Sequence, residues 1–335
     1  MMSTFVFDGQ VFKRLLIICL STSFMPAYAC SSLDELSLEW DPCFAVELDC
    51  SIEVFTSPYR DWAPTDRVFV NQYALLSLLH QSAAAYGDYA FFVTKGRSRI
   101  IMYNLKRREL LYSLELNSVN GETYHCNQSS FGTLKYERSD SFPLLYISQR
   151  SKADNRCFIE VFRILPFYDE ELLDYVSFQI ELVQTIYLPV MSYQNSLGNV
   201  NCAIDPNNGW MYTYSRNNNV QDDNYGQCKI TQFSIPDVYD KKVVLNDQDI
   251  VSSFMIEASA INMQGGCIQD GVMYIGQGTP SSGNVYLNII DLEKKELVRQ
   301  LDLKELGFNW EPEGCFFYDG SVMLTHIGAI CRIDK

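Results

Sequence analysis

Two carboxylates separated by one proline, Glu311 and Glu313, have the spacing in this chain that best suits acid–base chemistry. On a strand, residues two apart point the same way, and their Cα atoms lie at most ~7 Å apart. Such a pair could supply the two carboxylates of a glycosidase. Pro312 allows a simpler interpretation, in which the segment is the turn that begins a strand. Glu313 is therefore a candidate acid or base, and no residue is assigned as catalytic.

Histidine is the next residue type to consider, and the chain has three: His80, His125 and His326. No two of them have the spacing of metal ligands, and the sequence has no recognisable order of Ser, His and Asp typical of a catalytic triad. His326 lies inside an apolar strand pattern, which favours a packed or hydrogen-bonded core residue. His125 directly precedes a strand and joins Glu313 as a candidate acid or base. We predict no metal site from these histidines.

Two loops contain residues that could hold a small ligand. Residues 216–227 are rich in Asn and Asp, whose oxygens could bind calcium, but they lack the order of an EF-hand, and a solvated turn is the alternative. Gly276, Gln277 and Gly278 resemble a phosphate-binding loop, yet no helix follows to supply its N-terminus. Apart from this calcium possibility, no cofactor is expected.

The N-terminus has the pattern of an export signal. Lys13 and Arg14 precede an apolar stretch, residues 15–24, that is too short to span a bilayer, and Ala27-Tyr28-Ala29-Cys30 follows. We predict a signal peptide over residues 1–29 and a tether over residues 30–44. Cys30 would carry lipid in a lipoprotein; the alternative is plain secretion with Cys30 as an ordinary thiol. In either case we expect export to the periplasm, outer membrane or cell surface, with a lipid anchor as the only membrane contact.

The rest of the chain is long, apolar and acidic. It has 335 residues in all, of which 47% are hydrophobic, so a large buried core is feasible. A formal net charge of −15 opposes binding to the phosphate backbone of nucleic acids and to anionic membranes through a basic surface. We therefore expect no nucleic-acid partner.

The 11 cysteines include no Cys-x-x-Cys pair, which argues against zinc. In an oxidising compartment, disulfides are possible between several pairs, and spacing alone does not choose among them. The pairs considered are Cys43 with Cys50, Cys126 with Cys157, and Cys202 with Cys228.

Short strands dominate the remaining sequence, and they recur as five copies of one unit. Each copy reads as a small residue, a turn and a strand, followed by further strands, at spacings of roughly 40 to 75 residues. The small residues that anchor the copies are Ala84, Cys126, Cys202, Cys267 and Cys315. Repeats of about four strands predict an all-β, five-bladed β-propeller over residues 45–335. We expect the anchors to pack as small side chains at the crowded axis, with a redox or metal role as the alternative.

The last copy ends after about three strands, so its sheet needs an additional outer strand. An open strand edge invites aggregation. The alternating segment at residues 50–55, which begins at Cys50, precedes the first copy. We predict that this N-terminal strand closes the last blade.

Polar residues gather around the five anchors and should therefore meet at one rim of the axis. The predicted ligand-binding residues are Gln81, His125, Asn127, Asn201, Gln264, Glu311 and Glu313. Such a ring suits sugar hydroxyls or a cation. The alternative is that these side chains satisfy backbone groups and bind water.

Three short motifs carry a family resemblance: Gln264-Gly265, "EPEG" at residues 311–314, and "HCN" at residues 125–127. With them, residues 45–335 resemble the five-bladed propellers of teichoic-acid biosynthesis protein C-like proteins and phage receptor-binding proteins. They also resemble uncharacterised propeller lipoproteins of Gram-negative bacteria. The resemblance implies ligand or glycan binding at an envelope surface and no settled reaction. The cysteines in the inner strands depart from the polar or small residues expected there.

We therefore expect a cell-envelope module that binds a glycan or a protein without turnover. One alternative is a carbohydrate-active enzyme that acts at the channel rim through Glu313 and His125. A second alternative is a scaffold subunit of an outer-membrane complex.

Overall fold

The computed structural model describes most of the chain from residue 80 onward, together with two short strands before it. The described residues are 47–50, 68–71, 80–94, 99–116, 126–150, 157–189, 200–217, 221, 223–257, 262–308, 310–326 and 329–333. The signal-peptide and tether predictions, including Cys30, lie outside them. No helix in these ranges is both long and apolar enough to cross a bilayer.

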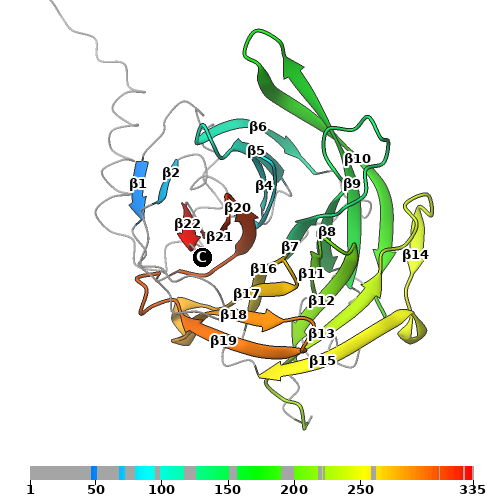
Figure 1. Cartoon of the computed structure of the whole chain (residues 1–335), viewed down its shortest axis with the longest axis vertical. Coiled ribbons are helices and arrows are strands. Elements are labelled where there is room, and N and C mark those ends of the chain that lie inside the picture. The colour runs from blue at the N-terminus through cyan, green and yellow to red at the C-terminus, as the bar shows by residue number, and fades with distance from the viewer. Residues whose placement is uncertain are drawn as a thin grey trace, which may run out of the picture. The chain divides into compact units, whose positions relative to one another are not determined.

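Five sheets, antiparallel except for one added edge strand, surround one axis, and Figure 1 shows them as the blades of a propeller. Each blade begins at its innermost strand. Blade 1 consists of β3 (His80–Tyr86), β4 (Tyr89–Thr94), β5 (Arg99–Asn104) and β6 (Glu109–Glu115). Blade 2 consists of β7 (Gln128–Phe131), β8 (Leu145–Arg150), β9 (Cys157–Asp169) and β10 (Asp174–Tyr187), with β14 (Lys242–Val244) added in parallel to β10.

The other three blades follow in chain order. Blade 3 consists of β11 (Asn201–Ile204), β12 (Trp210–Arg216), β13 (Gln227–Ser234) and β15 (Ile250–Glu257). Blade 4 consists of β16 (Met263–Gln269), β17 (Val272–Gly278), β18 (Val285–Asp291) and β19 (Glu296–Asp302). Blade 5 consists of β20 (Gly314–Tyr318), β21 (Ser321–His326) and β22 (Ala329–Ile333). Single 3₁₀ turns occur at Asp247–Asp249 and Pro280–Ser282.

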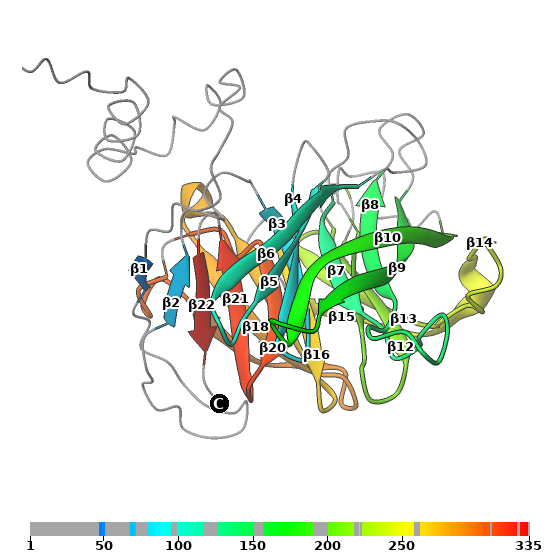
Figure 2. The same ribbon diagram turned by 90° about the horizontal axis from the view of Figure 1, so that it is seen from above.

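The inner strands form a closed ring, in which β3, β7, β11, β16 and β20 each contact the next and β20 returns to β3. The prediction of a five-bladed propeller is therefore confirmed. Figure 2 shows the same strands from above.

The apolar core is divided among the five interfaces between neighbouring blades. Five clusters of buried side chains each combine residues of two adjacent blades. Phe91 and Phe131 meet between blades 1 and 2 with ring centroids 5.5 Å apart, and Phe92 and Phe316 meet between blades 1 and 5 at 6.5 Å. Because each sheet is covered on both faces, many strands are buried along almost their whole length.

The five predicted anchors all lie in or directly before the inner strands and are at most 9% exposed. Their packing role is confirmed. Cys126, Cys157, Cys202 and Cys228 form no disulfide bond, so the two disulfides considered among them are wrong. Burial raises the pKa of the Cys228 thiol to about 12, which keeps it protonated and unreactive at neutral pH. Cys43 lies outside the described residues.

An N-terminal strand lies beside the three-stranded last blade, but it is not the segment that the sequence suggested. β2 (Val68–Asn71) contacts β22, and both figures show the two strands side by side. Cys50 instead ends β1 (Glu47–Cys50), where it pairs with Val68 of β2. Residues 51–55 lie outside the described residues. The prediction missed β2 because pairing partners depend on tertiary position, which alternation does not encode.

A buried ion pair holds the loop before β8 against β9. Both oxygens of Asp140 accept hydrogen bonds from the Arg163 guanidinium, at 2.7 and 3.0 Å. Burial by itself raises the pKa of Asp140, but the hydrogen bonds and the charge of Arg163 outweigh it, and the pKa is lowered. The ionised carboxylate is thus favoured in the folded state.

We expect Asp140→Asn to lower the free energy of unfolding by about 1.5 kcal/mol at pH 7, because it removes a charge-assisted pair. A carboxyl with a lowered folded pKa stabilises the protein above its unfolded pKa of about 3.9 and loses that effect as pH falls through the folded pKa. Urea unfolding of both proteins between pH 7 and pH 2.5 should therefore show a difference that begins to shrink below about pH 4 and is lost only as the pH falls through the lower folded pKa. Glu137→Gln is the control, since this more exposed carboxylate lies 3.3 Å from Arg163; an equal loss for both variants contradicts the prediction.

Candidate functional site

The inner strands of blades 4, 5 and 1 approach each other backbone to backbone at the axis. A Cβ atom on Gly265 would lie 2.4 Å from the Cα of Gly314. A Cβ atom on Gly314 would lie 2.7 Å from the amide nitrogen of Ala83. Side-chain atoms do not tolerate contacts this short, so glycine is required at both positions.

Polar side chains fill the rest of the axis and join blades across it. The Gln128 side-chain amide donates to the carbonyl oxygen of Gly266 at 2.6 Å, which links blade 2 to blade 4. Ser82 of blade 1 donates to Ser129 of blade 2 at 2.9 Å. Packed protein groups therefore fill the axis between the inner strands. The candidate site lies instead at the rim where the inner strands begin.

Four residues at that rim form a connected group, which we call the Gln264 cluster: Asn201, Tyr214, Gln264 and Glu311. The carbonyl oxygen of Gln264 accepts from the Tyr214 hydroxyl at 2.8 Å and from the Asn201 amide at 3.2 Å. The Gln264 side-chain amide donates to the Glu311 carboxylate. The structure therefore brings together three of the predicted binding residues, one each from blades 3 and 4 and one just before blade 5.

The other predicted residues are placed differently. Gln81 and Asn127 are each 7% exposed, so they belong to the packed region around the axis. Glu313 is also buried, and its backbone N–H donates to the Glu311 carbonyl oxygen at 3.0 Å. His125 lies outside the described residues. A binding role for these four stays a prediction.

An aromatic stack begins at Trp310, the residue directly before Glu311, and the sequence did not predict it. The rings of Trp310 and His326 are parallel within 1° and their centroids are 4.2 Å apart. Phe308 packs edge-on against both rings. His326 is buried, as predicted for a core residue, whereas Trp310 is 41% exposed. The only signal in the sequence was the position of Trp310 directly before Glu311.

The possible calcium loop at residues 216–227 is only partly described. Its two ends are joined as a hairpin, because Asn217 donates its N–H to the carbonyl oxygen of Gln227 at 2.8 Å. The Arg216 guanidinium lies over the Tyr225 ring at 5.3 Å. Within the described ranges, no group of three or more His, Cys, Asp or Glu side chains is arranged to hold a metal.

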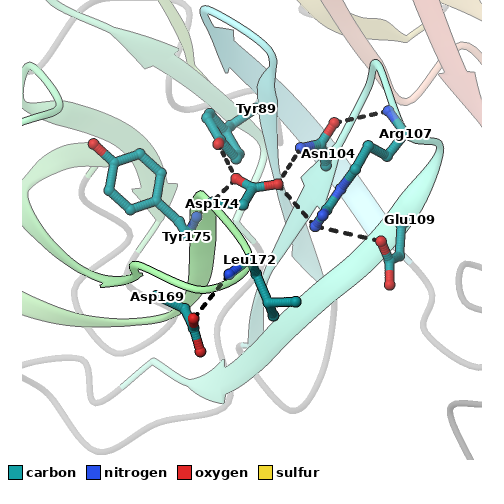
Figure 3. A network of polar contacts seen from close by, with 8 residues as sticks. All are labelled: Tyr89, Asn104, Arg107, Glu109, Asp169, Leu172, Asp174 and Tyr175. Atoms are coloured by element: carbon teal, nitrogen blue, oxygen red, sulfur yellow. Dashed lines mark hydrogen bonds and ion pairs between the residues drawn. The ribbon is translucent and has the colours of Figure 1, made fainter.

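A second polar cluster joins blade 1 to blade 2 at the opposite rim, where the inner strands end (Figure 3). Asp174, which begins β10, accepts hydrogen bonds from the Tyr89 hydroxyl and from the Asn104 amide, the latter at 2.9 Å. Arg107 forms an ion pair with the same carboxylate at 2.8 Å. Burial, together with the hydrogen bond to Asp174, raises the pKa of Tyr89, so its hydroxyl remains a donor at physiological pH. This cluster fixes the start of β10 to blade 1.

Comparison with known proteins yields fold likeness only. No known protein-family profile matches the chain, and no curated protein matches it in sequence. Among solved structures, the glutaminyl cyclase of Myxococcus xanthus is 10% identical with a TM-score of 0.42, covering 88% of this chain and 100% of that one. The Cps50 (Swd1) β-propeller domain of Myceliophteria thermophila is 10% identical with a TM-score of 0.38, covering 76% and 83%. The Dos1 propeller is 15% identical with a TM-score of 0.34, covering 81% and 60%.

We expect Gly265→Ala to lower the free energy of unfolding by about 2 kcal/mol or more, because the added methyl group would overlap the backbone of Gly314. Gly87→Asn is the matched control, since nothing lies within 4 Å of a Cβ there and asparagine tolerates its positive φ of 57°. Denaturant unfolding of the two purified variants measures the difference. A Gly265→Ala variant as stable as the control would show that the inner strands do not pack this closely.

Proposed function

We propose that this protein is an exported propeller that binds a cell-envelope carbohydrate, without turnover, at the rim where blades 4 and 5 meet. The observation that carries the proposal is the partly exposed Trp310, which directly precedes Glu311 in the chain, where the Glu311 carboxylate accepts a hydrogen bond from Gln264. An aromatic ring offers an apolar surface to the C–H face of a sugar, while a carboxylate and an amide can bind its hydroxyl groups.

Trp310 is held in position before any ligand arrives. His326 covers one face of the indole, so the exposed area belongs to the other face and the ring edges. Phe308, which is fully buried, packs against the edge of the same ring. A side chain that is already ordered loses little conformational entropy on binding, which favours affinity.

The polar partners are held in the same way. Tyr214 fixes the backbone of Gln264, and the Gln264 side chain in turn orients Glu311. A carboxylate that accepts hydrogen bonds from ligand hydroxyls forms charge-assisted bonds, which are stronger than neutral ones. The net charge of −15 favours a neutral or amino-bearing sugar over an anionic polymer.

Export and envelope location are supported by the N-terminal sequence pattern. The positive residues, the apolar stretch at residues 15–24 and Cys30 together suit a lipoprotein signal. A protein delivered to the envelope would meet glycans there at high local concentration. The proposed ligand class is therefore consistent with the proposed location.

A glycan array probed with the full-length protein, followed by calorimetry on the best ligand, tests the proposal. We expect Trp310→Ala to weaken binding at least about tenfold and Trp310→Phe to weaken it less, because phenylalanine keeps a stacking face. Tyr239→Ala is the control, since Tyr239 is an exposed aromatic residue on the β13–β14 connection. Thermal melting confirms that each variant is folded.

The outcomes separate the alternatives. Binding of no glycan, or equal affinity of Trp310→Ala and the wild type, would rule out the proposed site. Release of a hydrolysis product from a bound oligosaccharide would instead favour the carbohydrate-active enzyme, and Glu313→Gln would then be tested for loss of turnover.

A further inference from the structure

The hairpin of β9 and β10 is longer than any other in the described residues, and Figure 1 shows it extending from blade 2. β8 pairs only with the first part of β9, from Cys157 to Phe162. β9 and β10 continue to pair with each other up to Asp169 and Asp174. The far part of the hairpin is thus a two-stranded arm.

The arm is firmly attached to blade 1 along its inner side. Phe178 is 1% exposed, and its ring packs edge-on against Phe91 at 5.4 Å and Tyr112 at 5.6 Å. The Asp174 cluster of Figure 3 fixes the end of the arm directly beside the turn. The tip is therefore presented by a rigid support.

Apolar side chains are concentrated at this tip. Phe167, Tyr168, Leu172 and Leu173 are all exposed, with Leu172 at 60% and Leu173 at 76%. Single exposed apolar side chains are ordinary, but four of them within the seven residues 167–173 are unusual and mark an interaction surface.

Two other turns in this chain have the same geometry and show what such a turn ordinarily contains. In all three turns, the last residue has a positive φ: 56° at Arg108, 59° at Lys295 and 53° at Leu173. In all three, an Asn or Asp at the end of the preceding strand accepts the N–H of the third turn residue, which is Arg107, Lys294 or Leu172.

The chemistry of the three turns differs. The β5–β6 turn reads Leu-Lys-Arg-Arg and the β18–β19 turn reads Leu-Glu-Lys-Lys, with the leucine buried and the charged residues exposed. The β9–β10 turn reads Glu-Glu-Leu-Leu, and its leucines occupy the exposed positions. A leucine at a positive φ is also strained, because its Cβ crowds the backbone. Neither exposure to water nor the backbone conformation therefore favours a leucine at position 173.

We propose that this tip, residues 167–173, docks into an apolar pocket lined by Lys or Arg on a partner protein. The charge around the tip selects that occupant. Asp169, Glu170 and Glu171 flank the leucines, while Asp174 is already paired with Arg107. The same carboxylates oppose an anionic bilayer, and a net charge of −15 opposes a second copy of this chain. The tip lies at the rim opposite Trp310, so both sites could be occupied together.

The first step of the test is to place a photo-crosslinking amino acid at Leu173 in the full-length protein, in cells that produce it. The matched control places it at Lys295, the corresponding position of the β18–β19 turn. A protein crosslinked from Leu173 and not from Lys295 is identified and purified. Crosslinking alone does not support the proposal.

The second step measures binding of the purified partner to this protein by calorimetry. Leu172→Lys with Leu173→Lys gives the tip the chemistry of its two sister turns, and we expect at least about tenfold weaker binding with unchanged thermal stability. Glu170→Gln with Glu171→Gln should also weaken binding, and more so at low salt, because charge attraction is screened by salt. Lys294→Ala with Lys295→Ala should have no effect.

Several results would overturn the proposal: no crosslink specific to Leu173, a crosslink to a lipid or to a second copy, or equal partner binding by the double-lysine variant. Carbohydrate binding by that variant is measured in parallel. We expect it to be unchanged, so failure at the tip and failure at the Trp310 rim can be told apart.

Discussion

The fold depends on how closely the inner strands approach one another around the axis. Gly265 of β16 lies against Gly314 of β20, and Gly314 lies against the backbone of Ala83 in β3. No side chain fits between these backbones. Because the inner strands meet this closely, the faces of neighbouring blades also come into contact, and the apolar side chains form five layers between the blades.

This arrangement leaves the two rims for interactions with other molecules. The axis itself is occupied by hydrogen-bonded groups such as Gln128 and Ser129. One rim holds Gln264, at the start of β16, and Trp310 and Glu311, on the segment that leads into β20. The opposite rim holds the hairpin turns, of which only the β9–β10 turn exposes paired leucines among the three turns of this geometry. A rigid ring can therefore present different chemistry on its two sides.

The small anchor residues can be recognised in the sequence for a physical reason. A position that tolerates only small residues leaves a mark at the same place in each repeat, which is why Ala84 and the four cysteines were found. The disulfides considered at Cys126 and Cys202 were wrong, because the intended partners, Cys157 and Cys228, lie in different apolar layers on the other face of the same blade. An N-terminal strand was expected beside blade 5, and one is found there. That strand is β2, which lies beside β22, whereas Cys50 pairs with β2 and not with blade 5. Trp310 was not among the predicted binding residues, because the sequence does not show whether an aromatic side chain in a loop is buried or exposed.

Strand chemistry, the repeat and the small anchors were determined by the sequence itself, because local propensity and close packing restrict residue types at those positions. The meeting of Asn201, Gln264 and Glu311 was also foreseeable in part, since repeated units place equivalent positions on one rim. Only the tertiary structure decided which of these polar residues remain accessible, because exposure depends on what neighbouring blades cover. The tertiary structure also decided that Leu172 and Leu173 are exposed. Asp174 is far in the chain from Tyr89 and Arg107, and its contacts with them hold the turn beyond the blades.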